Sequence, residues 1–520
     1  MSAVDLPERL NAASALVDVH LRERRSAKPA ILCGDRTVTY GDLHASVNRL
    51  GNALKELGVR LEERVAILLP DSPEFAFAFF GAMKIGAVSV PLNTLLTPRD
   101  YEYLLNDCRA RVLIVHSSLL DHIAPIRANL RYLEHIVVSH GVPPLHGHLC
   151  LQSLMQSASP SLDPANTSKD DAAFWLYSSG TTGAPKGTIH LHHDMIVAAD
   201  RYAKETIGLR ESDVSFSVAK LFFAYGLGNG LYFPLRVGGT TVLLPDRPTP
   251  DRVFEVLDRY RPTVLYSVPT SYAAVLHAAE QSGRKGLDRV RMCVSAGEPL
   301  PKPLYEKWLA RFGVQILDGI GTTEILHIFI SNRPGKVKPG STGQIVAGYE
   351  ARIVDDDGRE LPPGQIGNLL IKGDSIAAGY WNKHEDTKNI FRGEWINTRD
   401  KFMVDKDGFF WYAGRADDLM KVAGYPVWPT DIEAVLQGHP AVLESGVVGA
   451  TDAEGLIKPK AYVVLKPGHT PSQHLAHELQ EFVKSNAAPY KYPRIVEFVD
   501  SLPKTATGKI QRYKLRERAR

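Results

Sequence analysis

A loop of glycines and hydroxyl side chains that ends close to a lysine follows the apolar run FWLY, at residues 178–187. Glycines let backbone N–H groups approach a ligand, hydroxyls donate hydrogen bonds and the lysine adds positive charge, so the loop is suited to phosphate. It is not a Walker loop, because Lys186 precedes Gly187 and not Ser or Thr. A flexible polar linker is the alternative. The predicted phosphate ligands are Ser178, Ser179, Gly180, Thr181, Thr182, Gly183 and Lys186.

A second glycine-rich segment, DGIGTTE at residues 318–324, ends a predicted strand. It presents Thr323 and the carboxylate of Glu324 at the carboxyl edge of the predicted sheet, where α/β folds bind their ligands. Capping of a helix by Glu324 is the alternative.

Three further charged residues stand in predicted turns. Asp400 offers a carboxylate, the natural acceptor for two ribose hydroxyls, although it could simply form the turn. Arg415 is a second candidate, and its alternative is a surface ion pair with Asp417 or Asp418. Lys509 lies in a tight glycine turn, TGKIQR, before a basic tail that could equally be solvated surface.

The segment AKLFFAYGLGNG, residues 219–230, combines aromatic side chains with small residues. Aromatic walls, with glycines that let the backbone close in, form a slot for a planar substrate. Packing of the same aromatic residues into the core is the alternative. His192 and His193 lie close to the phosphate loop, but without ligand carboxylates at a suitable spacing they favour packing or gating of a pocket over metal binding.

Alternating strands and helices are expected to position these residues. A helix is predicted over residues 8–24, and RVAILLP, FAFAFFGAMKIG and AVSVPLN predict a strand, a helix and a strand, with RVLIVH and HIVVS as further buried strands. A second alternating series runs from TVLYSV to VQILDGIG.

From about residue 341, short alternating strands between Gly, Asp and Pro turns predict a small barrel or meander. The last segment predicts helices near 429–438 and 473–485 with strands SGVVGA, KAYVVLK and RIVEFV. The predicted fold is α/β. A large N-terminal domain over residues 1–416 contains two α/β subdomains and a small β-barrel-like subdomain, and a small mobile α+β domain covers residues 417–520.

Composition excludes several classes of protein. The chain has 520 residues, of which 44% are hydrophobic and 23% charged, as in ordinary globular proteins. Lys plus Arg at 61 against Asp plus Glu at 58 gives a net charge of +3, too balanced for a nucleic-acid binder. No apolar stretch is long enough to span a membrane, and no signal peptide is expected, so we predict a cytoplasmic protein. The four separated cysteines are predicted to be reduced and buried.

Taken together, five motifs resemble the adenylate-forming family of acyl-CoA synthetases, adenylation domains and luciferases, and within it the benzoate–CoA ligase branch. The motifs are YSSGTTGAPKG, DGIGTTE, WINTRD, GRADDLMKVAG and PKTATGKIQR, in the family's order over nearly the whole chain. The resemblance implies ATP, Mg²⁺ and CoA as cofactor and substrates.

The resemblance also implies roles for single residues. It makes Glu324 the Mg²⁺ ligand, Thr323 a contact of the α-phosphate and Lys509 the catalytic lysine, and it makes Asp417 the hinge of the mobile domain. The implied CoA contacts are Lys421 and Gly424. The implied ribose and adenine contacts are Asp400, Arg415, Gly297, Glu298, Pro299, Asp318, Gly319 and Ile320, and the implied acid pocket consists of Ala224, Tyr225, Gly321, His327 and Ile328.

Two positions depart from the family pattern. Arg399 replaces a glycine before Asp400, so we expect that this turn cannot rely on a positive φ. Ile320 replaces a tyrosine that stacks on adenine in relatives, which leaves packing without the stacking contribution. His327 is also open to the alternative of a satisfied core histidine.

The predicted function is an ATP-dependent ligase that activates benzoate or a hydroxybenzoate as aryl-AMP and transfers the aryl group to CoA. A stand-alone adenylation enzyme that loads a carrier protein is one alternative, and a catalytically dead nucleotide or CoA sensor is another. Since no carrier module follows, free CoA is favoured. The expected partners are small molecules. A homodimer, and an acetyltransferase or deacetylase acting on Lys509, are left open.

Overall fold

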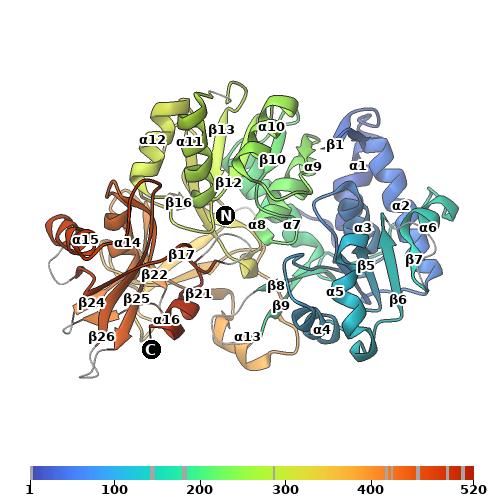
Figure 1. Ribbon diagram of the computed structural model, residues 1–520. Coiled ribbons are helices and arrows are strands. Elements are labelled where there is room, and N and C mark those ends of the chain that lie inside the picture. The colour runs from blue at the N-terminus through green and yellow to red at the C-terminus, as the bar shows by residue number, and fades with distance from the viewer. Residues whose placement is uncertain are drawn as a thin grey trace.

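The computed structural model describes residues 4–140, 147–178, 184–284, 287–415, 418, 420–422, 425–451, 457–487, 491–504 and 510–519. Two α/β layers built on large sheets come first in the chain, and a smaller α+β unit at the opposite side carries the C-terminus (Figure 1). The α/β class predicted from the sequence is therefore confirmed.

The first sheet has eight strands in the order β19-β9-β8-β4-β3-β5-β6-β7. The strands from β8 to β7 along this order run parallel, whereas β9 and β19 are added antiparallel at one edge. Continuous Val, Ile and Leu runs explain the burial of the central strands, since both faces of a parallel sheet are covered. Their bounds are β3 (Arg64–Leu68), β4 (Val88–Pro91), β5 (Val112–His116), β6 (His135–Ser139), β7 (Leu149–Cys150), β8 (Ala172–Ser178), β9 (Lys186–Leu191) and β19 (Gly379–Tyr380).

The second sheet has nine strands in the order β16-β15-β14-β13-β12-β10-β11-β1-β2. Its central strands are parallel, and the helices α10 (Pro250–Tyr260), α11 (Pro269–Ser282) and α12 (Lys302–Phe312) connect them (Figure 1). The strand bounds are β1 (Pro29–Cys33), β2 (Arg36–Thr39), β10 (Val214–Ser217), β11 (Thr240–Val242), β12 (Val264–Ser267), β13 (Met292–Ser295), β14 (Ile316–Gly321), β15 (Ile328–Ser331) and β16 (Gln344–Ile345).

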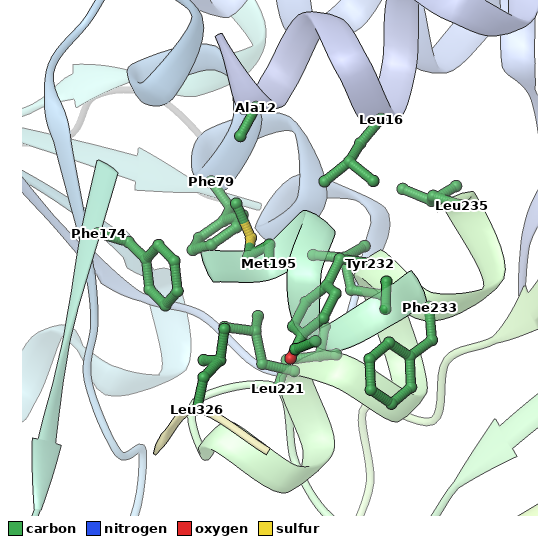
Figure 2. Close-up of a cluster of buried hydrophobic side chains, with 14 of the residues drawn as sticks. Ala12, Leu16, Phe79, Phe174, Met195, Leu221, Tyr232, Phe233, Leu235 and Leu326 are labelled. Carbon is green, nitrogen blue, oxygen red and sulfur yellow. The ribbon is translucent and has the colours of Figure 1, made fainter. Parts of the chain in front are cut away.

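A shared core joins the two sheets. All twelve residues of α3 (Pro73–Lys84) are buried, as the apolar run FAFAFFGAM requires. Side chains from distant parts of the chain converge there, as Figure 2 shows for Phe79, Phe174, Met195, Tyr232 and Leu326. The remaining helices of this region are α2 (Tyr40–Glu56), α4 (Pro98–Asp107), α5 (Leu120–Ile123), α6 (Leu151–Ser157), α7 (His192–Ala198), α8 (Ala224–Leu227) and α9 (Phe233–Arg236).

The helix predicted over residues 8–24 is shorter than expected. It begins at Ala12 and contains a π-helical segment, η1 (Ser14–Asp18), followed by α1 (Val19–Arg22). Asn11 explains the later start, because its Oδ1 accepts a hydrogen bond from Ser14 N while its Nδ2 donates to the carbonyl of Met83. The prediction that all cysteines are buried is also wrong for Cys150, which is half-buried at the edge strand β7.

Five of the strands after residue 341 form an antiparallel sheet of their own, with β18 (Gly367–Lys372) and β21 (Trp395–Val404) at its centre. Its strands pair along an open path among the described residues, and the consecutive strands β20, β21 and β22 pair antiparallel, as in the predicted meander. The other strands are β17 (Glu350–Val354), β20 (Phe391–Arg392) and β22 (Phe410–Arg415), and α13 (His384–Ile390) connects β19 to β20.

The C-terminal unit contains the predicted helices α14 (Pro429–Gln437) and α15 (Gln473–Asn486). They pack on the sheet β25-β26-β27, of bounds Val442–Thr451, Ile457–Leu465 and Ile495–Phe498. The hairpin β23 (Met420–Val422) and β24 (Tyr425–Val427) precedes them, and α16 (Arg512–Arg518) follows. The predicted boundary between residues 416 and 417 lies outside the described residues. No helix in the described parts of the chain has the length and apolar run needed to cross a membrane.

A buried charge network ties the N-terminal segment to this core. Lys84 is 1% exposed, and its Nζ donates to Asp18 Oδ1 at 2.7 Å and to Asn48 Oδ1 at 2.6 Å. Removing one member of a buried ion pair leaves the other charge unpaired.

We therefore expect Lys84→Ala to lower the free energy of unfolding by about 3 kcal/mol or more. Chemical denaturation followed by tryptophan fluorescence measures this loss. The control is Lys55→Ala, which removes an exposed lysine of α2. Equal stability of the two variants would contradict a structural role of the network.

Candidate active site

The ends of the predicted phosphate loop lie side by side. Ser178 ends β8, Lys186 begins β9, and the two are direct partners in the antiparallel ladder. Lys186 is 7% exposed, and its Nζ lies 2.5 Å from Asp386 Oδ1 of α13. The five predicted phosphate ligands Ser179, Gly180, Thr181, Thr182 and Gly183 lie outside the described residues.

Glu324, from the second sheet, faces the pair formed by Ser178 and Lys186. Its Oε1 accepts hydrogen bonds from the Tyr380 hydroxyl at 2.7 Å and from Ser178 Oγ at 3.4 Å. Glu324 lies in a short 3-10 turn, η6 (Thr323–Ile325), after β14 and is half-buried there. Burial, followed by the neighbouring Glu324 charge, raises the pKa of Tyr380, so its hydroxyl keeps its proton and donates. Glu324 thus receives hydrogen bonds at its side chain instead of capping a helix.

The carboxylate of Glu324 fits a divalent cation bound to phosphates. Mg²⁺ takes one or two protein carboxylates when phosphates supply the remaining ligands. Two hydroxyls orient Oε1, and the structure gives Oε2 no hydrogen-bond partner among the residues it describes. The described part of the chain holds no cluster of three or more His, Cys, Asp or Glu that would form an all-protein metal site.

A buried histidine that the sequence did not single out connects the two motifs. His190 Nε2 lies 2.8 Å from the carbonyl of Thr323, and its Nδ1 lies 2.7 Å from Asp194 Oδ2. Its ring therefore bridges the Thr323 carbonyl and the Asp194 carboxylate. The alternation HLHH at the end of β9 could have indicated an inward-facing His190.

The two neighbouring histidines are packing residues. His192 Nδ1 accepts from Ala12 N at 3.1 Å, and burial lowers the pKa of His192 to about 4. His193 lies between the carbonyls of Lys169 and Asp374, each 3.0 Å away. Neither takes part in a metal cluster of the described residues.

The predicted acid pocket brings Tyr225 and His327 together. Their ring centroids are 5.6 Å apart, and His327 Nε2 lies 3.3 Å from the Tyr225 carbonyl. The Tyr225 hydroxyl lies 3.1 Å from the carbonyl oxygens of both Ser267 and Val294, so it donates to backbone of the second sheet. Burial lowers the pKa of His327 to about 3, which makes this ring neutral.

The small residues around this pocket serve close packing of the chain itself. A Cβ at Gly228 would lie 2.5 Å from His327 Cδ2, and one at Gly226 would lie 2.0 Å from the Lys220 carbonyl. Phe222 is buried, whereas Ala224 and Phe223 are half-buried. Packing into the core therefore explains Phe222 and these glycines. The half-buried Phe223 and Ala224 keep exposed surface that a ligand could contact.

The remaining pocket and adenine candidates lie along one strand pair. Gly319, Ile320 and Gly321 belong to β14, and Ile328 belongs to the antiparallel neighbour β15. Asp318 is 6% exposed, and burial raises its pKa well above the ordinary range. Its Oδ2 accepts from Leu300 N at 3.5 Å, a contact that holds the segment containing Gly297, Glu298 and Pro299 against β14.

The ribose candidates Asp400 and Arg415 are direct partners across β21 and β22. Asp400 is 6% exposed, and its backbone N donates to Thr398 Oγ1 at 3.2 Å. The expectation for Arg399 is wrong, because this residue adopts φ of +60° despite its side chain. The strand bulges here, and Asn397 Oδ1 accepts from Arg399 N at 2.9 Å, which stabilises the left-handed conformation.

Several predicted residues have no described side chain. Lys509, Asp417 and Gly424 lie outside the described residues. Lys421 is placed by its backbone in β23, as Arg415 is in β22. The catalytic, hinge and CoA roles implied for them therefore stay predictions.

The sequence profile of AMP-binding enzymes matches residues 18–381, and that of the C-terminal domain of AMP-binding enzymes matches residues 431–509. The chain belongs to the AMP-binding enzyme family. It is 50% identical to a benzoate–CoA ligase of Thauera aromatica, over 99% of this chain and 97% of that one. It is 46% identical to a 4-hydroxybenzoate–CoA/benzoate–CoA ligase of Rhodopseudomonas palustris, over 98% and 94%. A crystal structure of an anthranilate CoA ligase in complex with anthranoyl-AMP is 46% identical, with a TM-score of 0.95 and coverage of 100% and 99%.

The left-handed conformation of Arg399 predicts an unusual preference for glycine. We expect Arg399→Gly to be more stable than Arg399→Ala by about 1 kcal/mol, because only glycine adopts this φ without a steric cost. Urea unfolding of both variants measures the difference. Lys406 is the control, because it is an exposed residue whose φ is not positive, so its alanine variant should be more stable than its glycine variant. A more stable glycine variant at both positions would contradict the left-handed conformation of Arg399.

Burial of neutral His327 predicts a loss of stability in acid. The pKa falls from 6.5 to about 3 on folding, so between these values the unfolded chain binds a proton that the folded chain does not. Stability is full above pH 6.5 and decreases below it, by about 2 kcal/mol at pH 5 from this group.

His327→Phe should remove that contribution, so its free energy of unfolding should fall less between pH 7 and pH 5 than that of the wild type. His474→Gln, which removes an exposed histidine, is the control. An unchanged pH dependence in His327→Phe would show that another group carries the effect.

Proposed function

We propose that this chain is an ATP-dependent aryl-CoA ligase that forms aryl-AMP and pyrophosphate, and then aryl-CoA and AMP. One observation carries the proposal: Lys186 from one sheet and Glu324 from the other both contact Tyr380. Three residues after Glu324, His327 packs against the ring of Tyr225. A cation and a metal-binding carboxylate suit the phosphates of ATP, and half-buried aromatic walls suit a flat ring. The relatives that act on benzoate and hydroxybenzoate support the same assignment.

In the first step a carboxylate oxygen of the acid attacks the α-phosphorus of ATP, and the bond to pyrophosphate breaks. Negative charge accumulates at phosphorus, and positive groups close to it lower the barrier. Lys186 supplies one such charge within a buried site, and Lys509 supplies the other by resemblance. A divalent cation held by Glu324 would neutralise charge on the phosphate oxygens when bound.

In the second step the thiol of CoA gives its proton to solvent, and its sulfur attacks the carbonyl carbon of aryl-AMP. The thioester bond forms, the acyl–phosphate bond breaks and AMP leaves with the electron pair. The second step forms no five-coordinate phosphorus, so Lys509 is required only for the first step.

We propose benzoate or a hydroxybenzoate as the acid. The Tyr225 hydroxyl is engaged by two backbone carbonyls, so it offers a wall and no further donor to the ring. His327 is neutral, so an additional negative charge on the ring would find no cation there. Both properties favour an aromatic acid whose only charge is its carboxylate.

Loading of a carrier protein is the second candidate, and it shares the first step. A catalytically dead sensor is disfavoured, because a protein that only binds its ligand has no use for the transition-state lysine, which is Lys509 by resemblance. The cytoplasmic location, a homodimer and acetylation of Lys509 stay predictions.

The test is product analysis with ATP, Mg²⁺, CoA and a series of benzoate, hydroxybenzoates, aminobenzoates, cinnamate and fatty acids. We expect aryl-CoA, AMP and pyrophosphate in equal amounts and a preference within the benzoates. Lys509→Ala should lower pyrophosphate release by about 100-fold or more, yet retain thioester formation from supplied aryl-AMP and CoA. Pyrophosphate release at the wild-type rate in that variant would contradict the mechanism. Formation of aryl-AMP without thioester by the wild type would favour loading of a carrier protein.

A further inference from the structure

A segment far from both motifs in the sequence contacts the charged groups of both. Residues 379–390, which we call the strap, comprise β19 and α13. The strap runs antiparallel to β9, with Gly379 opposite Ile189 and Tyr380 opposite Thr188. It begins nearly two hundred residues after the phosphate loop and lies against the strand that follows this loop.

Several hydrogen bonds fix the strap in this place. Trp381 N donates to the Gly187 carbonyl at 2.8 Å, and Trp381 Nε1 donates to the Asp107 carbonyl at 2.9 Å. Thr387 Oγ1 accepts from Tyr380 N at 3.1 Å and so connects the helix of the strap to its strand. The backbone of Tyr380 is therefore held from both sides.

Tyr380 is the point at which the strap contacts the predicted metal ligand. Its hydroxyl donates to Glu324 Oε1 at 2.7 Å, and its ring lies 5.4 Å from Lys186 Nζ. The ring packs edge-on against Phe391, with centroids 5.5 Å apart. One side chain thus touches a carboxylate from the second sheet and a cation from the first.

Asp386 is the point at which the strap contacts the phosphate-loop lysine. Its carboxylate lies 2.5 Å from Lys186 Nζ, and the lysine side chain is 9% exposed while Asp386 is 34% exposed. Burying an ammonium group without a neighbouring anion costs free energy, and Asp386 supplies that anion. The phosphates of ATP would bring a second anion to the same ammonium, so the two anions compete for Lys186.

We propose that Tyr380 and Asp386 are positioning residues of the nucleotide site. Tyr380 holds the carboxylate of Glu324 in the orientation that binds the metal, and Asp386 holds Lys186 until the phosphates displace it. This inference rests on the proposed function, since it takes Glu324 and Lys186 as the metal and phosphate contacts.

The experiment measures ATP binding by calorimetry, with Mg²⁺ and with EDTA, in the wild type and in each variant. The ratio of the two dissociation constants is the gain that the metal provides. Tyr380→Phe should reduce this gain by about tenfold, the usual effect of losing a hydrogen bond to a charged group. Binding in EDTA should stay close to that of the wild type.

Tyr260→Phe is the control for Tyr380→Phe, because it also removes a hydroxyl that donates a hydrogen bond, in this case to the backbone carbonyl of Gly34. A general loss of structure would weaken binding equally with and without the metal. If Tyr380→Phe does not fold, Thr387→Val replaces it, since it removes the acceptor of Tyr380 N and should lower the metal gain in the same direction. An unchanged gain in the variant that folds overturns the role of Tyr380.

Asp386→Asn should change ATP affinity and leave the gain from the metal unchanged, the reverse of Tyr380→Phe. Without the competing carboxylate, ATP should bind several-fold more tightly in EDTA, and the gain from the metal should not change. Glu385→Gln is the matched control, because it neutralises the exposed neighbouring carboxylate of the same helix. Equal or weaker ATP binding by Asp386→Asn overturns the role of Asp386.

Failure of this inference is distinguishable from failure of the proposed function. Wild-type protein that forms no aryl-CoA from any acid overturns the function, whatever the variants bind. Active wild-type protein whose variants show an unchanged metal gain and unchanged ATP affinity retains the function and loses the positioning roles.

Discussion

The site depends on one constraint, the antiparallel addition of β9 and β19 to the edge of a parallel sheet. A parallel sheet alone would direct the strand after the phosphate loop to a distant crossover. Because β9 instead turns back along β8, Lys186 returns beside Ser178. Pairing of β19 with β9 then brings Tyr380 within hydrogen-bonding distance of Glu324, which comes from the other sheet.

This arrangement places opposite charges in a half-buried position where electrostatic interactions are strong. Glu324 is oriented by hydroxyls, Lys186 is paired with Asp386, and the Thr323 carbonyl is held by His190. None of these contacts lies within a single motif. The motifs supply the chemical groups, while segments between them, such as β19 and α13, supply the orientation that preorganised catalysis requires.

The class of fold and the order of its elements could be predicted from the sequence, because apolar runs and glycine stops report local structure. Helices near 429–438 and 473–485 were within one residue of α14 and α15. The strap contacts could not be predicted, since the partners of Tyr380 and Asp386 are set by a strand pairing between residues far apart. The expectation for Arg399 was wrong because a bulge and a hydrogen bond to the Asn397 side chain together permit a positive φ, which the residue type alone disfavours.

Above all, we propose that Glu324 and the phosphate loop form one site that activates an aromatic acid with ATP. Its most direct test is the exchange of labelled pyrophosphate into ATP by the wild type and by Glu324→Gln, with and without benzoate. We expect exchange by the wild type only when an aromatic acid and Mg²⁺ are present, and a loss of about 100-fold in the variant. Exchange by Glu324→Gln at the wild-type rate, or wild-type exchange that does not depend on the acid, would contradict the account.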